Sequence, residues 1–127
     1  MILDFTPTTF EMVRGDTFTL PLKLNQGNRL YYEQYQLQGN DKLYIGIMKP
    51  GESFENATIR CALDKNSARN ENGDTIFKLN SVDTENLYPG KYYISIKLVR
   101  NGSVNTLVND KLFFITGSDP VNKVGCC

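Results

Sequence analysis

The side chains that could do chemistry in this 127-residue chain are carboxylates and cysteines, because the sequence contains no histidine. Without histidine, Ser-His-Asp and Cys-His nucleophile pairs and histidine-ligated zinc sites are excluded. Paired carboxylates could still hydrolyse glycosidic bonds, but Asp and Glu fall mainly at turn and exposed positions, such as Asp16, Asp41, Glu52 and Asp74. The chain also has no Gly-x-x-x-x-Gly-Lys phosphate loop. We therefore expect no enzymatic activity, no metal and no cofactor.

The three cysteines indicate where the chain is made. Cys61 stands alone, while Cys126 and Cys127 are adjacent at the end. The spaced cysteine pair of antibody domains is missing, and this usage is typical of a reducing cytoplasm. The N-terminus lacks a secretion signal, and no apolar run approaches the roughly 20 residues that cross a bilayer. We expect Cys61 to pack as a small apolar residue, and we expect no membrane partner.

The charge balance bears on nucleic acids. Fourteen Lys and Arg residues balance fourteen Asp and Glu residues, and the basic residues are scattered along the chain. Binding driven by phosphate neutralisation needs a basic excess or a basic stripe. The sequence therefore predicts no nucleic-acid partner.

Two motifs could bind a protein or a sugar. Arg14-Gly15-Asp16 is the tripeptide that integrins recognise, but Gly-Asp between two strands is also suited to a tight turn, and we interpret it as a turn. The polar segment 25–41 contains Tyr31, Tyr32 and Tyr35. Tyrosine is enriched at interface anchors, so these rings are candidate partner contacts. The alternative is that one or two of them cap an end of the domain.

The strand that best indicates the fold follows a Pro-Gly turn. After Pro89 and Gly90 the chain alternates strictly, which is typical of a half-buried strand. Tyr92 lies just past this turn and suggests a tyrosine corner, in which the phenol hydroxyl bonds backbone a few residues upstream. We assign a structural role to this corner, Leu87, Pro89, Gly90 and Tyr92. The inward residues are Tyr92, Ile94, Ile96 and Leu98.

The remaining alternating runs predict an all-β fold. Pro21 places its strand at a sheet edge or at a bulge. Asn101-Gly102 predicts a hairpin, and its second strand is expected to bulge near Asn109-Asp110. About seven short strands fit an immunoglobulin-like antiparallel β-sandwich, with an open barrel as the alternative. The predicted strands cover residues 10–13, 17–24, 42–48, 57–63, 75–79, 91–99 and 103–115.

The predicted organisation is one domain with two extensions. Residues 1–8 are expected to form an extended arm, residues 9–116 the sandwich, and residues 117–127 a flexible tail. Leu3 and Phe5 of the arm are further candidate partner contacts, because an extended arm can add to the sheet edge of a neighbour.

Three segments together resemble a known family. They are Val13-Arg14-Gly15-Asp16-Thr17-Phe18, Leu87-Tyr88-Pro89-Gly90-Lys91-Tyr92-Tyr93, and the hairpin around Asn101-Gly102 with Val104-Asn105-Thr106-Leu107. They are similar to immunoglobulin-like domains of tailed-bacteriophage virion proteins, particularly the N-terminal domain of the baseplate upper protein family. The resemblance spans roughly residues 9–116.

This resemblance implies a non-enzymatic structural component of a virion that assembles in the bacterial cytoplasm. Baseplate upper proteins usually carry further segments after this domain, whereas this chain ends soon after the last predicted strand. We therefore expect an auxiliary or decoration protein of the capsid, or a small adaptor, with a baseplate or tail component as the alternative. Its partners would be the major capsid protein or baseplate and tail proteins. A function of another class is a carbohydrate-binding adhesion module for host-surface glycans.

Overall fold

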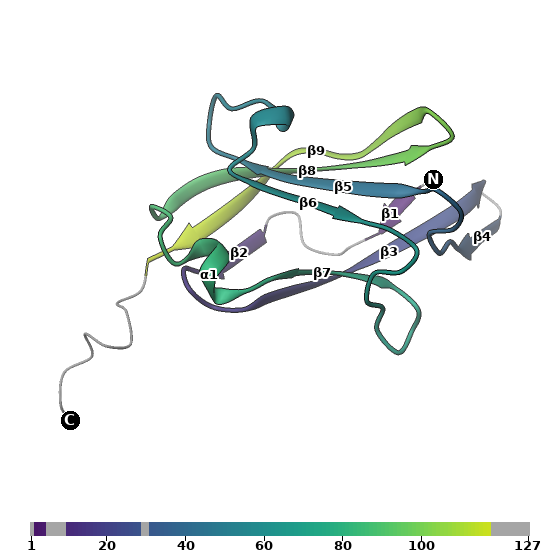
Figure 1. Cartoon of the computed structure of the whole chain (residues 1–127), viewed down its shortest axis with the longest axis horizontal. Coiled ribbons are helices and arrows are strands. Elements are labelled where there is room, and N and C mark those ends of the chain that lie inside the picture. The colour runs from purple at the N-terminus through teal and green to yellow at the C-terminus, as the bar shows by residue number, and fades with distance from the viewer. Residues whose placement is uncertain (1, 5–9, 29–30, 118–127) are drawn as a thin grey trace.

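The computed structural model describes residues 2–4, 10–28 and 31–117, which form two facing β-sheets (Figure 1). One sheet has the strand order β2-β9-β8-β5-β6, and the other has β1-β3-β4 with β7 also paired to β3. The all-β sandwich prediction is confirmed. The elements are β1 (Ile2–Asp4), β2 (Phe10–Val13), β3 (Phe18–Asn28), β4 (Tyr31–Gln34), β5 (Lys42–Met48), the 3-10 helix η1 (Phe54–Asn56), β6 (Ile59–Leu63), β7 (Thr75–Leu79), α1 (Ser81–Thr84), β8 (Gly90–Arg100) and β9 (Ser103–Thr116).

The core lies between the inner faces of the two sheets, as the period-2 alternation predicts. The four inward residues of β8 are each 3% exposed or less. They pack with the inner residues of β5 and, across the sandwich, with those of β3 and β7. Full burial of such a side chain contributes about 1.5–3 kcal/mol. The most buried members are Leu22, Leu24, Leu37, Leu43, Ile45, Ile47, Phe77, Ile94, Ile96, Leu98, Phe113 and Ile115.

The β8–β9 hairpin follows the sequence prediction closely. Asn101 and Gly102 both have positive φ, as a type I′ turn requires, and they join the paired residues Arg100 and Ser103. The predicted bulge is present, because Asp110 has φ +50° and the register shifts there. A second register shift follows one step closer to the turn and was not predicted.

Two pairings differ from the sequence prediction. β2 pairs with β9 in parallel, from Phe10 opposite Phe113 to Val13 opposite Thr116, so the five-stranded sheet is not wholly antiparallel. Residues 2–4 of the predicted arm form β1, which pairs antiparallel with residues 23–25 of β3. This part of the arm therefore belongs to the sandwich, while Phe5 and residues 118–127 lie outside the described residues.

The polar segment 25–41 begins with the end of β3 and the strand β4, which pair as a hairpin. β3 continues to Asn28, and β4 returns beside it with Tyr31 opposite Asn28. The short helix α1 begins with a capping box formed by Asn80 and Asp83. The 3-10 helix η1 begins after Ser53, whose side chain makes no capping hydrogen bond. Within the described residues, no helix has the length and apolar character needed to cross a bilayer.

Candidate interaction surfaces

The corner before β8 is a structural unit. The Tyr92 hydroxyl donates a hydrogen bond of 2.7 Å to the carbonyl oxygen of Tyr88, four residues upstream. Burial raises the pKa of the Tyr92 phenol, which keeps it as a neutral donor. Leu87 packs against the core beside it. The hydrogen bond expected of a tyrosine corner is therefore present.

The Arg14-Gly15-Asp16 segment is a turn that docks on the chain near α1. The Asp16 amide donates to the Val13 carbonyl at 3.0 Å, and Gly15 has φ +84°. The Gly15 amide donates to the hydroxyl of buried Thr84 at 2.9 Å, and Arg14 Nη1 donates to the Leu87 carbonyl at 3.3 Å. These bonds join the start of β3 to the corner and account for the tripeptide structurally.

Tyr35 is a core residue and not an exposed contact. Its side chain is 5% exposed, and its hydroxyl donates to the carboxylate of Asp41. Asp41 and Asp74 were expected at exposed positions, but both are buried. Arg100 lies over the ring at 4.8 Å, with its Nε 3.8 Å from Asp41 Oδ1. Burial and this carboxylate raise the pKa of the Tyr35 phenol. The cluster joins the segment after β4 to the end of β8, contacts between residues far apart in sequence that no local pattern indicates.

The other candidate contacts differ in how far their side chains are exposed to solvent. Tyr31 is 66% exposed on β4, whereas Leu3 is half-buried against the core. The side chain of Tyr32 and the whole of Phe5 lie outside the described residues. Val104, 60% exposed near the start of β9, was not predicted. The β3–β4 and β8–β9 hairpins lie at the same end of the sandwich (Figure 1), which we call the hairpin end.

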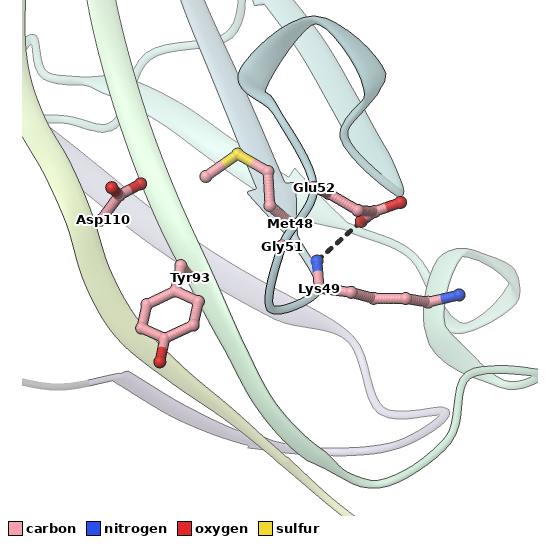
Figure 2. Close-up of a pocket in the computed structure, with 6 residues that line it drawn as sticks. All are labelled: Met48, Lys49, Gly51, Glu52, Tyr93 and Asp110. Atoms are coloured by element: carbon pink, nitrogen blue, oxygen red, sulfur yellow. Dashed lines mark hydrogen bonds between the residues drawn. The ribbon is translucent and has the colours of Figure 1, made fainter.

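A hollow of about 160 Å³ opens on the outer face of β5 and β8, beside the β9 bulge (Figure 2). The Glu52 carboxylate there accepts the Lys49 amide and the Thr58 hydroxyl, each at 2.7 Å. These bonds lower the pKa of Glu52 and fix the turn after β5. In the view of Figure 2, Met48 lies between Glu52 and Asp110. Glu52 therefore has a structural role, and the two carboxylates do not form a facing pair.

The outer face of β5 carries η1. Gly46 lets the Phe54 ring approach, since a Cβ at position 46 would lie 2.9 Å from that ring. Lys97 Nζ lies 4.7 Å from the centre of the same ring. Beside Phe54, a shallow hollow of about 280 Å³ extends over β5 and β6 and is lined by Tyr44 and Arg60. Cys61 is half-buried, and burial raises the pKa of its thiol, in accord with the expected apolar packing.

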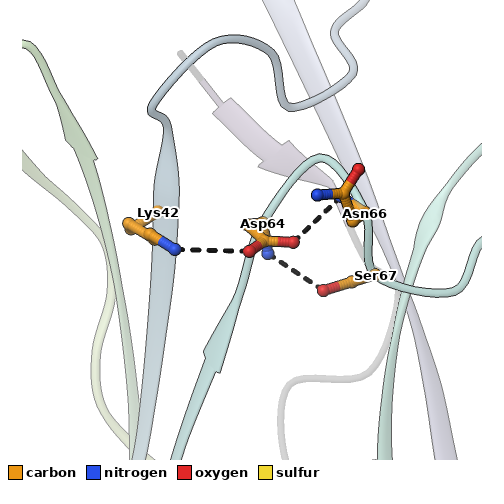
Figure 3. A network of polar contacts seen from close by, with 4 residues as sticks. All are labelled: Lys42, Asp64, Asn66 and Ser67. Atoms are coloured by element: carbon orange, nitrogen blue, oxygen red, sulfur yellow. Dashed lines mark hydrogen bonds and ion pairs between the residues drawn. The ribbon is translucent and has the colours of Figure 1, made fainter.

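The end of β6 is fixed by a polar network (Figure 3). Asp64 accepts the Asn66 amide at 2.9 Å and Lys42 Nζ at 3.2 Å, and its own amide donates to Ser67 Oγ at 2.9 Å. The Asn66 amide, followed by Lys42, lowers the pKa of Asp64. The network turns the chain away immediately after Leu63, where β6 ends. β6 is the outermost strand on this side of its sheet.

Within residues 2–4, 10–28 and 31–117, no three His, Cys, Asp or Glu side chains gather where they could hold a metal ion. Exposed apolar side chains lie at the hairpin end, with Tyr31 and Val104, and also near α1 and the corner before β8, with Val82 and Tyr88. The strand edges are further surfaces available for contact. Comparison with protein-family models, with curated proteins and with solved structures gives no match to this chain.

Proposed function

We propose that this protein is a non-enzymatic structural component of a tailed-phage virion. It would be an auxiliary or decoration protein of the capsid or a small adaptor, with a baseplate or tail position as the alternative. The proposal starts from the sequence resemblance. The observation that carries it further is the Tyr92–Tyr88 hydrogen bond, because the segment behind the resemblance forms a tyrosine corner in a two-sheet sandwich.

The strand order also supports the immunoglobulin-like part of the proposal. β3 and β7 pair in one sheet, and β9, β8 and β5 are neighbours in the other. This division corresponds to the B–E and G–F–C strands of immunoglobulin sandwiches. Of the other two parts of the resemblance, the Arg14-Gly15-Asp16 turn leads from β2 into β3, and the Asn101-Gly102 turn connects β8 to β9.

Such a protein would act through its surface. The Arg14–Leu87 and Tyr92–Tyr88 bonds fix one end of the sandwich, and the Tyr35–Asp41–Arg100 cluster fixes the other. A frame held at both ends presents its exposed residues with little loss of conformational entropy on binding. Tyr31 and Val104 at the hairpin end are the exposed apolar groups we assign to a virion partner.

The test is to locate the protein in particles. An antibody raised against the purified chain is applied to phage particles from a lysate of the bacterium that expresses the gene, and gold labels are viewed by electron microscopy. We expect labels on every particle, over the capsid for a decoration protein or at the tail tip for a baseplate protein. Absence of the protein from purified particles, by labelling and by mass spectrometry, would contradict the proposal.

A further inference from the structure

The strand edges of the sandwich differ in how they are protected against pairing with another chain. Natural sheets block exposed edges with proline, charge, bulges or a covering segment. β3 carries Pro21 opposite Ile76, and its next residues are covered by β1. On β7, the Ile76 amide donates to the Ala68 carbonyl at 3.0 Å, and Lys78 adds an exposed charge. Both edges of this sheet therefore carry protection.

The two edges of the other sheet are unlike each other. On one side, the four-residue strand β2 covers residues 113–116 of β9, and the rest of β9 is interrupted by two register shifts, with Asp110 at φ +50°. β6 pairs with β5 in one unbroken register from Ile59 to Leu63, and it contains no proline or glycine. Among the described residues, β5 is its only strand partner. β6 is thus a regular edge that carries one exposed charge, Arg60, but no proline, no bulge and no covering strand among the described residues.

The pairing pattern fixes which backbone groups β6 leaves open. In a two-residue hairpin the closing residues exchange both hydrogen bonds, so Arg100 bonds to β9. Because bonding sides alternate along a strand, Ser95 bonds to Gly46 of β5, and Ile45 bonds to Cys61 of β6. The amides and carbonyls of the intervening residues, Arg60 and Ala62, therefore point to the open edge.

The sequence of β6 is complementary to itself about Cys61. In an antiparallel pair of two β6 strands centred there, Ile59 lies opposite Leu63 and Cys61 opposite Cys61 on the inner face. Arg60 lies opposite Ala62 on the outer face, so no like charges are directly opposed. Arg60 takes part in neither of the two ion pairs found among the described residues.

From this edge geometry we infer that β6 is a docking edge for a second copy of the same chain. The two strands pair antiparallel about Cys61 and join the two five-stranded sheets into one. Four backbone hydrogen bonds form, two for each pair of Arg60 and Ala62. The inference rests on the strand geometry and holds whether or not the protein resides in a virion. The small contact is expected to give a reversible dimer that dissociates on dilution.

The first experiment measures the register by cross-linking. The full chain carries Cys126→Ser and Cys127→Ser, so that Cys61 is the remaining thiol. Diamide oxidises two Cys61 thiols to one disulfide and takes up the two electrons and two protons. In a pair without direct hydrogen bonds the two Cα atoms lie within disulfide reach. We expect a cross-linked dimer whose yield falls on dilution.

The register is checked by moving the thiol. In the same background with Cys61→Ser, Arg60→Cys and Ala62→Cys are made separately. A mixture of the two is expected to cross-link several-fold more than either variant alone, because Arg60 faces Ala62 of the other copy. Equal cross-linking in all three samples would overturn the proposed register.

The second experiment breaks the edge without touching the pairing to β5. Ala62→Pro removes an outward amide, and we expect dimer dissociation to rise at least about tenfold. Lys78→Pro removes an outward amide from β7 and is the matched control, which should leave the dimer unchanged. Sedimentation velocity over a concentration series measures the dimer dissociation constant of both variants. A wild-type chain that stays monomeric at all concentrations, or a dimer that Ala62→Pro does not weaken, overturns the inference.

Discussion

The edge strands β7 and β6 differ in whether their outward backbone groups are free to pair with another chain. Both strands are five residues long and both lie at the side of a sheet. Each strand carries one exposed cation, Lys78 on β7 and Arg60 on β6, but on β7 the Ile76 amide is already bonded to the Ala68 carbonyl. On β6, the backbone groups of Arg60 and Ala62 point to the edge of the sheet, and no further strand of the described residues pairs with them. Since an open edge is an aggregation hazard, this contrast is the basis for the docking edge that we infer at β6.

The largest effect is expected from a proline on the bonded side of β6. Cys61→Pro removes an amide that bonds to β5, and we expect the free energy of unfolding to fall by about 3 kcal/mol. Ala62→Pro, one residue away, should cost less than about 1 kcal/mol because its amide points outward. Urea denaturation measures both. Equal losses would show that the assigned bonding sides are wrong.

A smaller effect separates stability from association. Tyr92→Phe removes the hydrogen bond to the Tyr88 carbonyl and should lower the free energy of unfolding by about 1 kcal/mol. Because the corner belongs to the core frame and not to the β6 edge, the dimer dissociation constant should not change. Urea denaturation and sedimentation velocity on the same sample give the two quantities. A loss of dimer equal to that of Ala62→Pro would contradict this separation.

Removing the protection of β3 should make that edge behave like β6. Pro21→Ala is expected to lower the free energy of unfolding by about 0.4–1 kcal/mol, because proline restricts the unfolded chain. It also restores an outward amide, and a molecule with two open edges can form chains longer than dimers. Light scattering should therefore show larger species than in the wild type. Unchanged scattering would mean that Pro21 does not protect the edge.

The smallest effect is a pH dependence at the end of β6. The pKa of Asp64 is lowered by the Asn66 amide and Lys42, so its contribution is present above the unfolded pKa and is lost as pH falls through the folded pKa. Below about pH 4 the turn should therefore loosen. Asp64→Asn should flatten the dependence of stability on pH in that range. An unchanged slope in the variant would exclude this role for Asp64.

Local patterns predicted the elements whose causes are local. The alternation from Tyr92 to Leu98, the Asn101-Gly102 hairpin and the bulge near Asp110 all depend on neighbouring residues. The burial of Tyr35 depends on Asp41 and on Arg100, which folding alone brings near. The docking of residues 2–4 depends on β3 in the same way.

The open edge of β6 belongs to the second group of features. Its residues alternate between inward and outward positions, which predicts a strand. This pattern does not indicate which strands lie beside it. That information comes from the sheet order, in which β5 separates β6 from β8. The sequence alone therefore predicted the strand, whereas only the sheet order shows that one side of β6 has no neighbouring strand.

The most direct test of the β6 edge is amide hydrogen exchange, followed by NMR at high and low protein concentration. We predict that the amides of Arg60 and Ala62 exchange slowly in the concentrated sample and rapidly after dilution. The outward amide of Lys78 on β7 should exchange at the same rate in both samples. If the rates of Arg60 and Ala62 do not depend on concentration, β6 is not the surface through which this protein associates.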